Sequence, residues 1–250
     1  MNEAVSERVT AAMVVIGDEI LSGRTKDVNV GFLAETLTAL GIDLCEVRMV
    51  SDEEAAIVEA INTLRARNSY VFTSGGIGPT HDDITADSVS AAFGVPCTHH
   101  PKAFADMAAD YEARGMEFTQ ARQRMARTPE GARLIENGVS KAPGFVIGNV
   151  HVMAGVPRVF QAMVGAVAPT LRTGVPIVSR TVDCPFGEGD IGEPLAAIQK
   201  DSPDVAIGSY PRWEDGRFST QLVVRGRDPA AVERTVEAVR AMVDGLVRAG

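Results

Sequence analysis

The sequence contains little cysteine and few aromatic residues. Only three of its 250 residues are cysteines, and phenylalanine, tyrosine and tryptophan together contribute 5%. Cys45, Cys97 and Cys184 lie far apart and form no CxxC pair, which argues against a disulfide framework and against a structural zinc site. Such cysteine usage is typical of a reducing compartment, so we predict a cytoplasmic protein.

Positive charge and long apolar runs are also scarce. The net charge is −9, whereas proteins that bind nucleic acids or anionic membranes present a basic surface. We therefore expect neither as a partner, although a local basic pocket remains compatible with this total. The apolar run near the N-terminus, AAMVVI at 11–16, is too short for a signal sequence or a membrane span.

The chain does contain a repeated alternation of apolar runs and helical periodicity. Residues 9–16 form a continuous apolar run, which is typical of a strand buried on both faces of a parallel sheet. Further strands are predicted over 42–50 and 69–72, and helices over 29–40, 51–68 and 85–93. Three consecutive strand–helix units predict a doubly wound α/β fold with a mostly parallel sheet.

Polar side chains near the predicted helix starts suggest how the helices are capped. Ser51 and Glu54 have the spacing of a capping box. Asn29 and Thr85 are predicted as N-caps, and Asp87 is predicted as a first-turn acid that the helix dipole favours. These assignments give each residue a purely structural role.

The second half of the chain is expected to be organised differently. Residues 101–127 look helical, 145–153 predict a hairpin around a Gly148-Asn149 turn, and 158–171 return to helix. From about residue 174 the predicted order is strand, helix, strand, strand, helix. We therefore predict a main domain over 9–172 and a small α+β C-terminal domain over 173–250.

The stretch TSGGIGPTHDDITADS, residues 73–88, carries the strongest functional signal. Gly75, Gly76 and Gly78 allow a tight turn whose N–H groups point into one concavity, and such nests before a helix bind anions. The stretch is neither a Walker A loop nor a dinucleotide-binding GxGxxG motif. Asp82 and Asp83 stand beside the glycines, and two solvated turn aspartates are the alternative interpretation.

Further acids follow the other predicted strands. Asp18 and Glu19 come after the first strand, and Asp52 comes after the second. The carboxyl ends of parallel strands share one edge of the sheet, so these acids should converge there with the glycine stretch. Carboxylates repel phosphates, but a divalent cation would bridge the two. The residues alone leave open whether the acids form turns or a site.

Several segments resemble one known family. GDEILSGRTKDVNVGFLAETLTALG, VSDEEAAIVEAI and TSGGIGPTHDDITADSVSAAFG are similar to the molybdopterin-binding (MoaB/Mog) domain of molybdenum-cofactor biosynthesis proteins. RQRMARTPEGARLIENGVSKAPGF, HVMAGVPRVF and IGSYP resemble the CinA-type branch, which includes competence/damage-inducible CinA proteins and the pyrophosphatase-like domain of FAD synthases. The resemblance covers residues 10–248, with Ala154 where the family usually has proline.

The resemblance implies roles for individual residues. It makes Asp52 and Asp83 the catalytic and metal-binding pair. A diphosphate or pterin ligand would be bound nearby by Ser74, Gly75, Gly76, Gly78, Pro79, Thr80, Asp82, Asp18 and Glu19. Asn137, Lys141 and Gly144, the last within a Pro143-Gly144-Phe145 turn, would form a wall of the pocket.

Our leading hypothesis is a CinA-type pyrophosphatase that cleaves ADP-ribose or FAD with a divalent metal ion such as Mg, Mn, Co or Ni. One alternative is a module that binds molybdopterin or a nucleotide without turnover. Another is adenylyl transfer to molybdopterin, although the CinA-type C-terminal half argues against it. We expect a homo-oligomer whose ligand is a small nucleotide or pterin.

Overall fold

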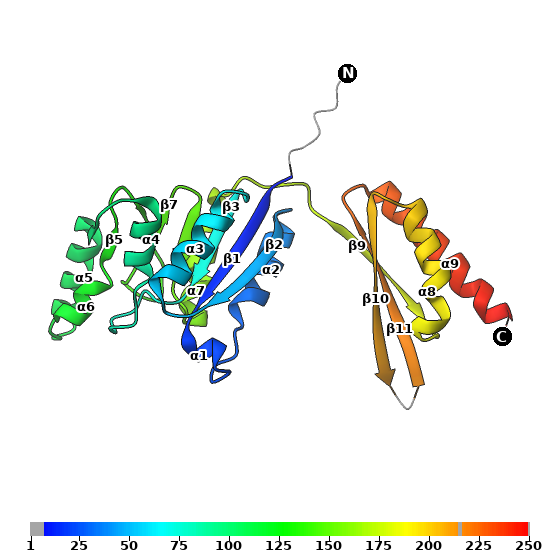
Figure 1. Cartoon of the computed structure of the whole chain (residues 1–250), viewed down its shortest axis with the longest axis horizontal. Coiled ribbons are helices and arrows are strands. Elements are labelled where there is room, and N and C mark those ends of the chain that lie inside the picture. Colours follow the sequence, from blue (N-terminus) through cyan, green and yellow to red (C-terminus); the bar gives the residue numbers. More distant parts are fainter. Residues whose placement is uncertain (1–7, 215–216, 250) are drawn as a thin grey trace, which may run out of the picture. The chain divides into compact units, whose positions relative to one another are not determined.

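The computed structural model of the chain describes residues 8–214 and 217–249, and it divides into two units between Gly174 and Val175 (Figure 1). The first unit contains β1 (Thr10–Ile16), α1 (Asp18–Leu21), α2 (Asn29–Ala39), β2 (Asp43–Val50), α3 (Glu54–Arg65), β3 (Tyr70–Ser74), α4 (Thr85–Phe93), β4 (Cys97–His99), α5 (Pro101–Ala113), α6 (Gln120–Arg124), β5 (Arg127–Pro129), β6 (Arg133–Ile135), β7 (Gly144–Ile147), β8 (Val150–Met153), α7 (Pro157–Val167) and η1 (Ala168–Thr170).

The first unit is built on a six-stranded sheet with the order β2-β1-β3-β8-β7-β6. Strands β2, β1, β3 and β8 pair in parallel, whereas β7 pairs antiparallel with both β8 and β6. Helices α2 and α7 cover one face of this sheet, and α3 and α4 cover the other (Figure 1). This architecture confirms the predicted doubly wound, mostly parallel α/β fold.

Strand β1 lies inside the sheet, between β2 and β3, and contributes to both cores. Met13 and Val15 pack into the core with α2 and α7, whereas Val14 and Ile16 pack into the core with α3 and α4. Each of these side chains is at most 2% exposed. A strand that is buried on both faces has no polar alternation, and the continuous apolar run at 9–16 predicted this correctly.

The predicted helix caps are wrong at three helices. The N-cap of α3 is Glu53, and no side chain caps this helix, so the box between Ser51 and Glu54 does not form. Asn29 and Thr85 are the first residues inside α2 and α4 rather than their N-caps. Their side chains turn toward the loops that follow the strands, where they form the hydrogen bonds described below.

Two other differences concern helices of the first unit. The predicted helical region 101–127 consists of α5 and α6 with a non-helical link between them, and Arg127 already belongs to β5. Gly115 in this link has a φ of 63°, a conformation that ends a helix. Helix α1 was not predicted, because four residues are too few to show helical periodicity.

The hairpin and the C-terminal elements follow the prediction. β7 and β8 pair antiparallel around Gly148, which has a φ of 55°. The second unit contains β9 (Val178–Cys184), α8 (Glu188–Asp201), β10 (Val205–Glu214), β11 (Arg217–Gly226) and α9 (Pro229–Ala249). Its antiparallel sheet has the order β10-β11-β9 and shares one core with both helices. Within the described part of the chain, no helix combines the length and apolarity needed to cross a bilayer.

Candidate functional site

The direction of winding reverses between β1 and β3. The chain leaves β1 through α2 to reach β2 on one side, and it then returns through α3 to reach β3 on the other side of β1. The carboxyl ends of β1 and β3 therefore border a topological switch point, where ligands bind in sheets of this kind. Asp18 and Glu19 follow β1 directly, and the glycine stretch follows β3.

The loop from Gly75 to Gly78, which we call the glycine loop, can be formed only with glycine at its first two positions. Gly75 and Gly76 have φ angles of 109° and 67°, which other residues rarely adopt. A Cβ atom on Gly75 would lie 2.1 Å from the carbonyl oxygen of Ile16, and one on Gly76 would lie 2.1 Å from Thr85 Oγ1. The glycine loop is thus pressed against the end of β1 and the start of α4.

Three consecutive N–H groups of the glycine loop are available to a ligand. The N–H of Gly75 donates to the carbonyl oxygen of Met153 at 3.2 Å. Those of Gly76, Ile77 and Gly78 have no protein acceptor among residues 8–214 and 217–249. Unpaired N–H groups just before a helix are suitable donors to an anion. This geometry supports the anion nest that the sequence predicts.

Thr85 and Asn29 hold the glycine loop in place. The Thr85 hydroxyl donates to the carbonyl oxygen of Gly75 at 3.0 Å. The Asn29 amide donates to Ser74 Oγ and to the carbonyl oxygen of Gly155, both at 2.8 Å. Asn29 is 3% exposed, so these bonds are made out of water. Asp27 takes over the capping role, since its Oδ1 accepts from the N–H of Val30 at 2.8 Å.

A small pocket of about 60 Å³ lies beside this hydrogen-bonded group, at the ends of β1 and β3. Its lining includes Glu19, Asn29, Ser74 and Gly155. The Oδ1 atom of Asn29 is buried and has no protein partner, although Asn29 is fixed by its two donor bonds. The sequence did not predict that Asn29 lines this pocket, because an asparagine just before a helix has the typical pattern of an N-cap.

Asp83 closes the loop that follows the glycines. Its Oδ2 atom accepts from the backbone N–H of Thr80 at 2.8 Å and also from the Thr80 hydroxyl. A Cβ atom on Gly78 would lie 2.6 Å from this same oxygen. The carboxylate of Asp83 therefore lies directly against the glycine loop, with one oxygen committed to Thr80. Pro79, between them, is exposed.

The acids that follow the three strands are brought together as predicted. The N–H of Asp18 donates to Asp52 Oδ2 at 3.0 Å. Burial raises the pKa of Asp52, and the negative charges of Asp18, Glu19 and Asp82 raise it further. The site therefore carries concentrated negative charge, and Asp52 is the carboxylate most affected by it.

These acids fit a cation that is shared with a ligand. Within the described residues, no three side chains of His, Cys, Asp or Glu are placed to hold a metal ion together. Mg²⁺ characteristically binds to one or two carboxylates and completes its shell with water and substrate phosphates. Asp52, with its raised pKa, and the second oxygen of Asp83 are oxygen donors suited to this mode.

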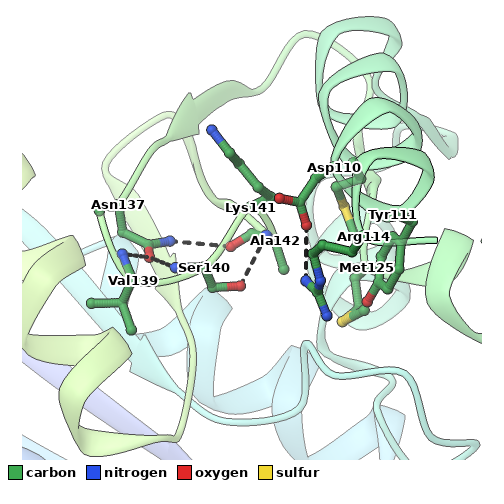
Figure 2. Close-up of a pocket in the computed structure, with 11 residues that line it drawn as sticks. Asp110, Tyr111, Arg114, Met125, Asn137, Val139, Ser140, Lys141 and Ala142 are labelled. Carbon is green, nitrogen blue, oxygen red and sulfur yellow. Dashed lines mark hydrogen bonds and ion pairs between the residues drawn. The ribbon is translucent and has the colours of Figure 1, made fainter. Parts of the chain in front are cut away.

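The residues predicted to wall the pocket lie in separate places: Pro143 and Phe145 line a cavity with residues of the glycine loop, whereas Asn137 and Lys141 do not. Asn137 closes its own loop, because its Oδ1 accepts from the N–H groups of Val139 and Ser140 at 3.0 and 2.7 Å. Asn137 and Lys141 line a pocket against α5 (Figure 2), not the glycine loop. A Cβ on Gly144 would lie 2.3 Å from the carbonyl oxygen of Val152, so close strand packing requires this glycine.

Two arginines near the glycine loop were not predicted. Arg124 and Arg127 line a narrow cavity together with Gly76, Gly78, Asp83 and the flanking residues Pro143 and Phe145. Arg124 donates to the carbonyl oxygen of Asp83 at 3.2 Å, and its Nε is buried without a partner. Arg127 forms an ion pair with Asp87. The partners in each pair are about 40 residues apart in the sequence, so no local pattern predicts these contacts.

Comparison with known proteins gives five matches. Residues 12–173 match the family described as a probable molybdopterin binding domain, and residues 176–248 match the middle domain of FAD synthase. A protein from Aeropyrum pernix is 31% identical over 250 residues, which cover 95% of this chain and 92% of the relative. A probable FAD synthase from Caenorhabditis elegans is 29% identical over 266 residues, which cover 96% of this chain but 51% of that protein.

The fifth match is to a solved structure. The crystal structure of CinA from Thermoplasma acidophilum, described as having unknown function, is 32% identical to this chain with a TM-score of 0.61. The match covers 65% of this chain and 98% of the CinA chain. Together, these five matches, to two family models, two relatives and one solved structure, confirm the resemblance seen in the sequence and the fold that it implies.

Proposed function

Since this chain belongs to the probable molybdopterin binding domain family, we propose that its first unit cleaves the phosphoanhydride of ADP-ribose or FAD with a divalent metal ion. The observation that carries this proposal is the convergence of two opposite features. The free N–H groups of residues 76–78 attract phosphate, whereas Asp52 lies among further carboxylates that repel it. A shared cation reconciles the two.

Each group then has a defined task. The N–H groups of residues 76–78 bind oxygens of the diphosphate and fix its orientation. Asp52 and Asp83 would hold the cation, which when bound neutralises phosphate charge and makes water more acidic. Asp18 and Glu19 orient the attacking water and accept its proton. A new P–O bond to water forms as the bridging P–O bond breaks, and AMP is released.

The comparisons support FAD as one candidate substrate. Both the middle domain matched by residues 176–248 and the Caenorhabditis elegans relative carry the name FAD synthase. The name FAD synthase describes those proteins and does not select between the two substrates. The glycine loop accepts the diphosphate of either FAD or ADP-ribose in the same way. The N–H nest contacts only the part that the two substrates share, so their relative rates must be measured.

The proposal is tested by measuring AMP release from both substrates with Mg, Mn, Co or Ni present. We expect release with at least one metal, its loss in EDTA, and a decrease of about 100-fold or more in Asp52→Ala and Asp83→Ala. Asp183→Ala is the matched control, because Asp183 is an exposed aspartate on β9 in the second unit. A chain that releases no AMP with any of these metals would overturn the proposal.

Ligand binding without turnover is the second candidate, and one observation favours it. No three acidic, histidine or cysteine side chains of the described ranges form a ready metal cage, as a dedicated metalloenzyme often has. A melting midpoint that rises with ADP-ribose, FAD or molybdopterin, without any hydrolysis, would select this function.

A further inference from the structure

A second pocket lies between α5 and the loop of residues 137–142, and it has a volume of about 290 Å³. Figure 2 shows the loop on one side and the helix, with Asp110, Tyr111 and Arg114, on the other. The volume is close to the lower range of small-molecule sites. It is much larger than the pocket of about 60 Å³ at the ends of β1 and β3.

The pocket is lined mainly by groups that form hydrogen bonds. Asp110 and Arg114 pair across one turn of α5 at 2.9 Å, and they face Ser140 on the opposite wall (Figure 2). Lys141 extends along the rim, away from the Arg114 guanidinium. The pair and the lysine give the lining one excess positive charge, in a chain whose net charge is −9.

The aromatic ring in the lining is not free for stacking. Phe118 stacks on Tyr111 with ring centroids 5.3 Å apart. The guanidinium carbons of Arg122 and Arg114 lie 4.7 and 5.2 Å from the Tyr111 ring centroid. Because its faces are occupied, Tyr111 presents its edge and hydroxyl to the pocket. These groups suit a polar ligand better than a flat ring system such as a flavin.

One residue is shared between this pocket and the narrow cavity beside the glycine loop. Met125, at the end of α6, lines this pocket and also the cavity that contains Gly76, Gly78 and Arg124. That cavity has a volume of about 10 Å³, so a ligand whose diphosphate lies on the glycine loop reaches Arg114 only if Met125 moves aside. Methionine side chains are unbranched and adapt their shape readily.

We propose that this pocket binds the sugar-phosphate half of a two-part nucleotide substrate, the half on the far side of the cleaved anhydride. Asp110 accepts bonds from the sugar hydroxyls, and Arg114 donates to oxygens of the sugar or its phosphate. The inference rests on the proposed function, and it favours ADP-ribose over FAD because the ribose 5-phosphate half is small and polar.

Binding of the separate halves tests this assignment without any turnover. Affinities for ribose 5-phosphate, AMP, FMN and inorganic phosphate are measured by calorimetry on the wild-type full chain, Arg114→Ala, Asp110→Asn and Arg180→Ala. Arg180 is the matched control, since its pair with Glu233 in the second unit spans 2.8 Å and it is as exposed as Arg114. Exposed pairs of this kind contribute little to stability, so the variants should fold.

We expect ribose 5-phosphate to bind more tightly than inorganic phosphate. Its affinity should fall about tenfold in Arg114→Ala and in Asp110→Asn, while AMP affinity stays unchanged in both and Arg180→Ala resembles the wild type. Unchanged ribose 5-phosphate binding in Arg114→Ala, or FMN binding that alone depends on Arg114, would overturn the assignment. Loss of turnover with intact, Arg114-dependent binding would instead count against the proposed function only.

Discussion

The backbone N–H of Asp18 donates to the carboxylate of Asp52 at 3.0 Å, which joins the end of β1 to the end of β2. This hydrogen bond lowers the pKa of Asp52. Burial and the negative charges of nearby acids outweigh it, so the pKa is raised overall; these acids are Asp18, Glu19 and Asp82. The fold thus places this carboxylate in an environment that disfavours its ionised form. Strained arrangements of this kind are common where a bound ligand supplies the missing stabilisation.

Asp52→Asn should therefore raise stability while it weakens metal binding. For an acid whose folded pKa is raised, the unfavourable contribution is present above that pKa and disappears as the pH falls below its unfolded value. Asparagine keeps the acceptor for Asp18 but removes the charge. We expect a slightly higher urea midpoint at pH 7, by less than about 1 kcal/mol because the group is largely solvated, and a large loss of metal-dependent activity.

Asp183→Asn is the matched control for this experiment. Asp183 is an exposed aspartate on β9 in the second unit, and its charge is not among those that raise the pKa of Asp52. This variant should show no gain in urea midpoint. If Asp52→Asn is no more stable than the wild type without metal, then the carboxylates of Asp18 and Glu19 do not destabilise the site as argued.

Gly75→Ala should destabilise the first unit strongly. Gly75 has a φ of 109°, and a Cβ atom would lie 2.1 Å from the carbonyl oxygen of Ile16 at the end of β1. Neither the backbone angle nor the contact can relax without moving β1, so we expect a loss of about 2–3 kcal/mol in urea unfolding.

Gly31→Ala provides the comparison, since Gly31 lies inside α2 with open space around the added Cβ. It should stabilise the chain by about 0.5–1 kcal/mol. A Gly75→Ala variant as stable as Gly31→Ala would show that the glycine loop is not pressed against β1.

The strands and their order could be predicted because the signal is local and repeated. The apolar run that became β1 needs no partner to be recognised, and the three units of strand and helix fix a parallel sheet. Asn29 and Thr85 show where this reasoning fails. Both have the residue type and position of an N-cap, but tertiary contacts with Ser74 and Gly75 determine where their side chains point.

Part of the site could be predicted because it follows from the order of strands and helices. Residues that directly follow a strand, such as Asp18, Asp52 and Asp83, are placed by the topology alone. Arg124 contacts Asp83 from a helix about 40 residues further along the chain, and no spacing rule encodes that distance. Lys141 was predicted to lie beside the glycines, but it lies in a loop that packs on α5.

Asn29→Ala should lower stability and loosen the glycine loop. The side chain is 3% exposed and donates to Ser74 Oγ and to the Gly155 carbonyl oxygen. Its removal leaves the buried Ser74 Oγ and the Gly155 carbonyl oxygen without this donor, which costs about 1–3 kcal/mol in the free energy of unfolding. Hydrogen exchange at Gly75, whose N–H donates to the carbonyl oxygen of Met153 at 3.2 Å, should also become faster.

Asn62→Ala is a suitable control, because this amide lies in α3 and its oxygen accepts from Arg65 one turn away. It should leave the exchange of the glycine loop unchanged. Equal unfolding free energies for the Asn29→Ala and Asn62→Ala variants would contradict the role of Asn29 in holding the loop.

His151 should make the stability of the first unit depend on pH. The ring lies in β8, 4% exposed, with its centroid 5.0 Å from Phe72 and 5.6 Å from Tyr70. Burial lowers its pKa to about 4, and the charge of Arg133 contributes to this shift. Its Nδ1 atom has no hydrogen-bond partner, so the neutral ring is the form that the fold accepts.

The direction of this effect follows from proton linkage. Below about pH 6.5 the unfolded chain binds a proton at His151 that the folded chain does not, so stability falls as the pH decreases toward 4. The full difference amounts to roughly 3 kcal/mol, and above pH 6.5 this residue contributes no pH dependence. His151→Phe should flatten the urea-unfolding profile between pH 6.5 and 4.5, whereas His81→Asn, with a side chain 99% exposed, should keep the wild-type slope. A His151→Phe profile as steep as that of the wild type would assign the acid sensitivity to the carboxylates instead.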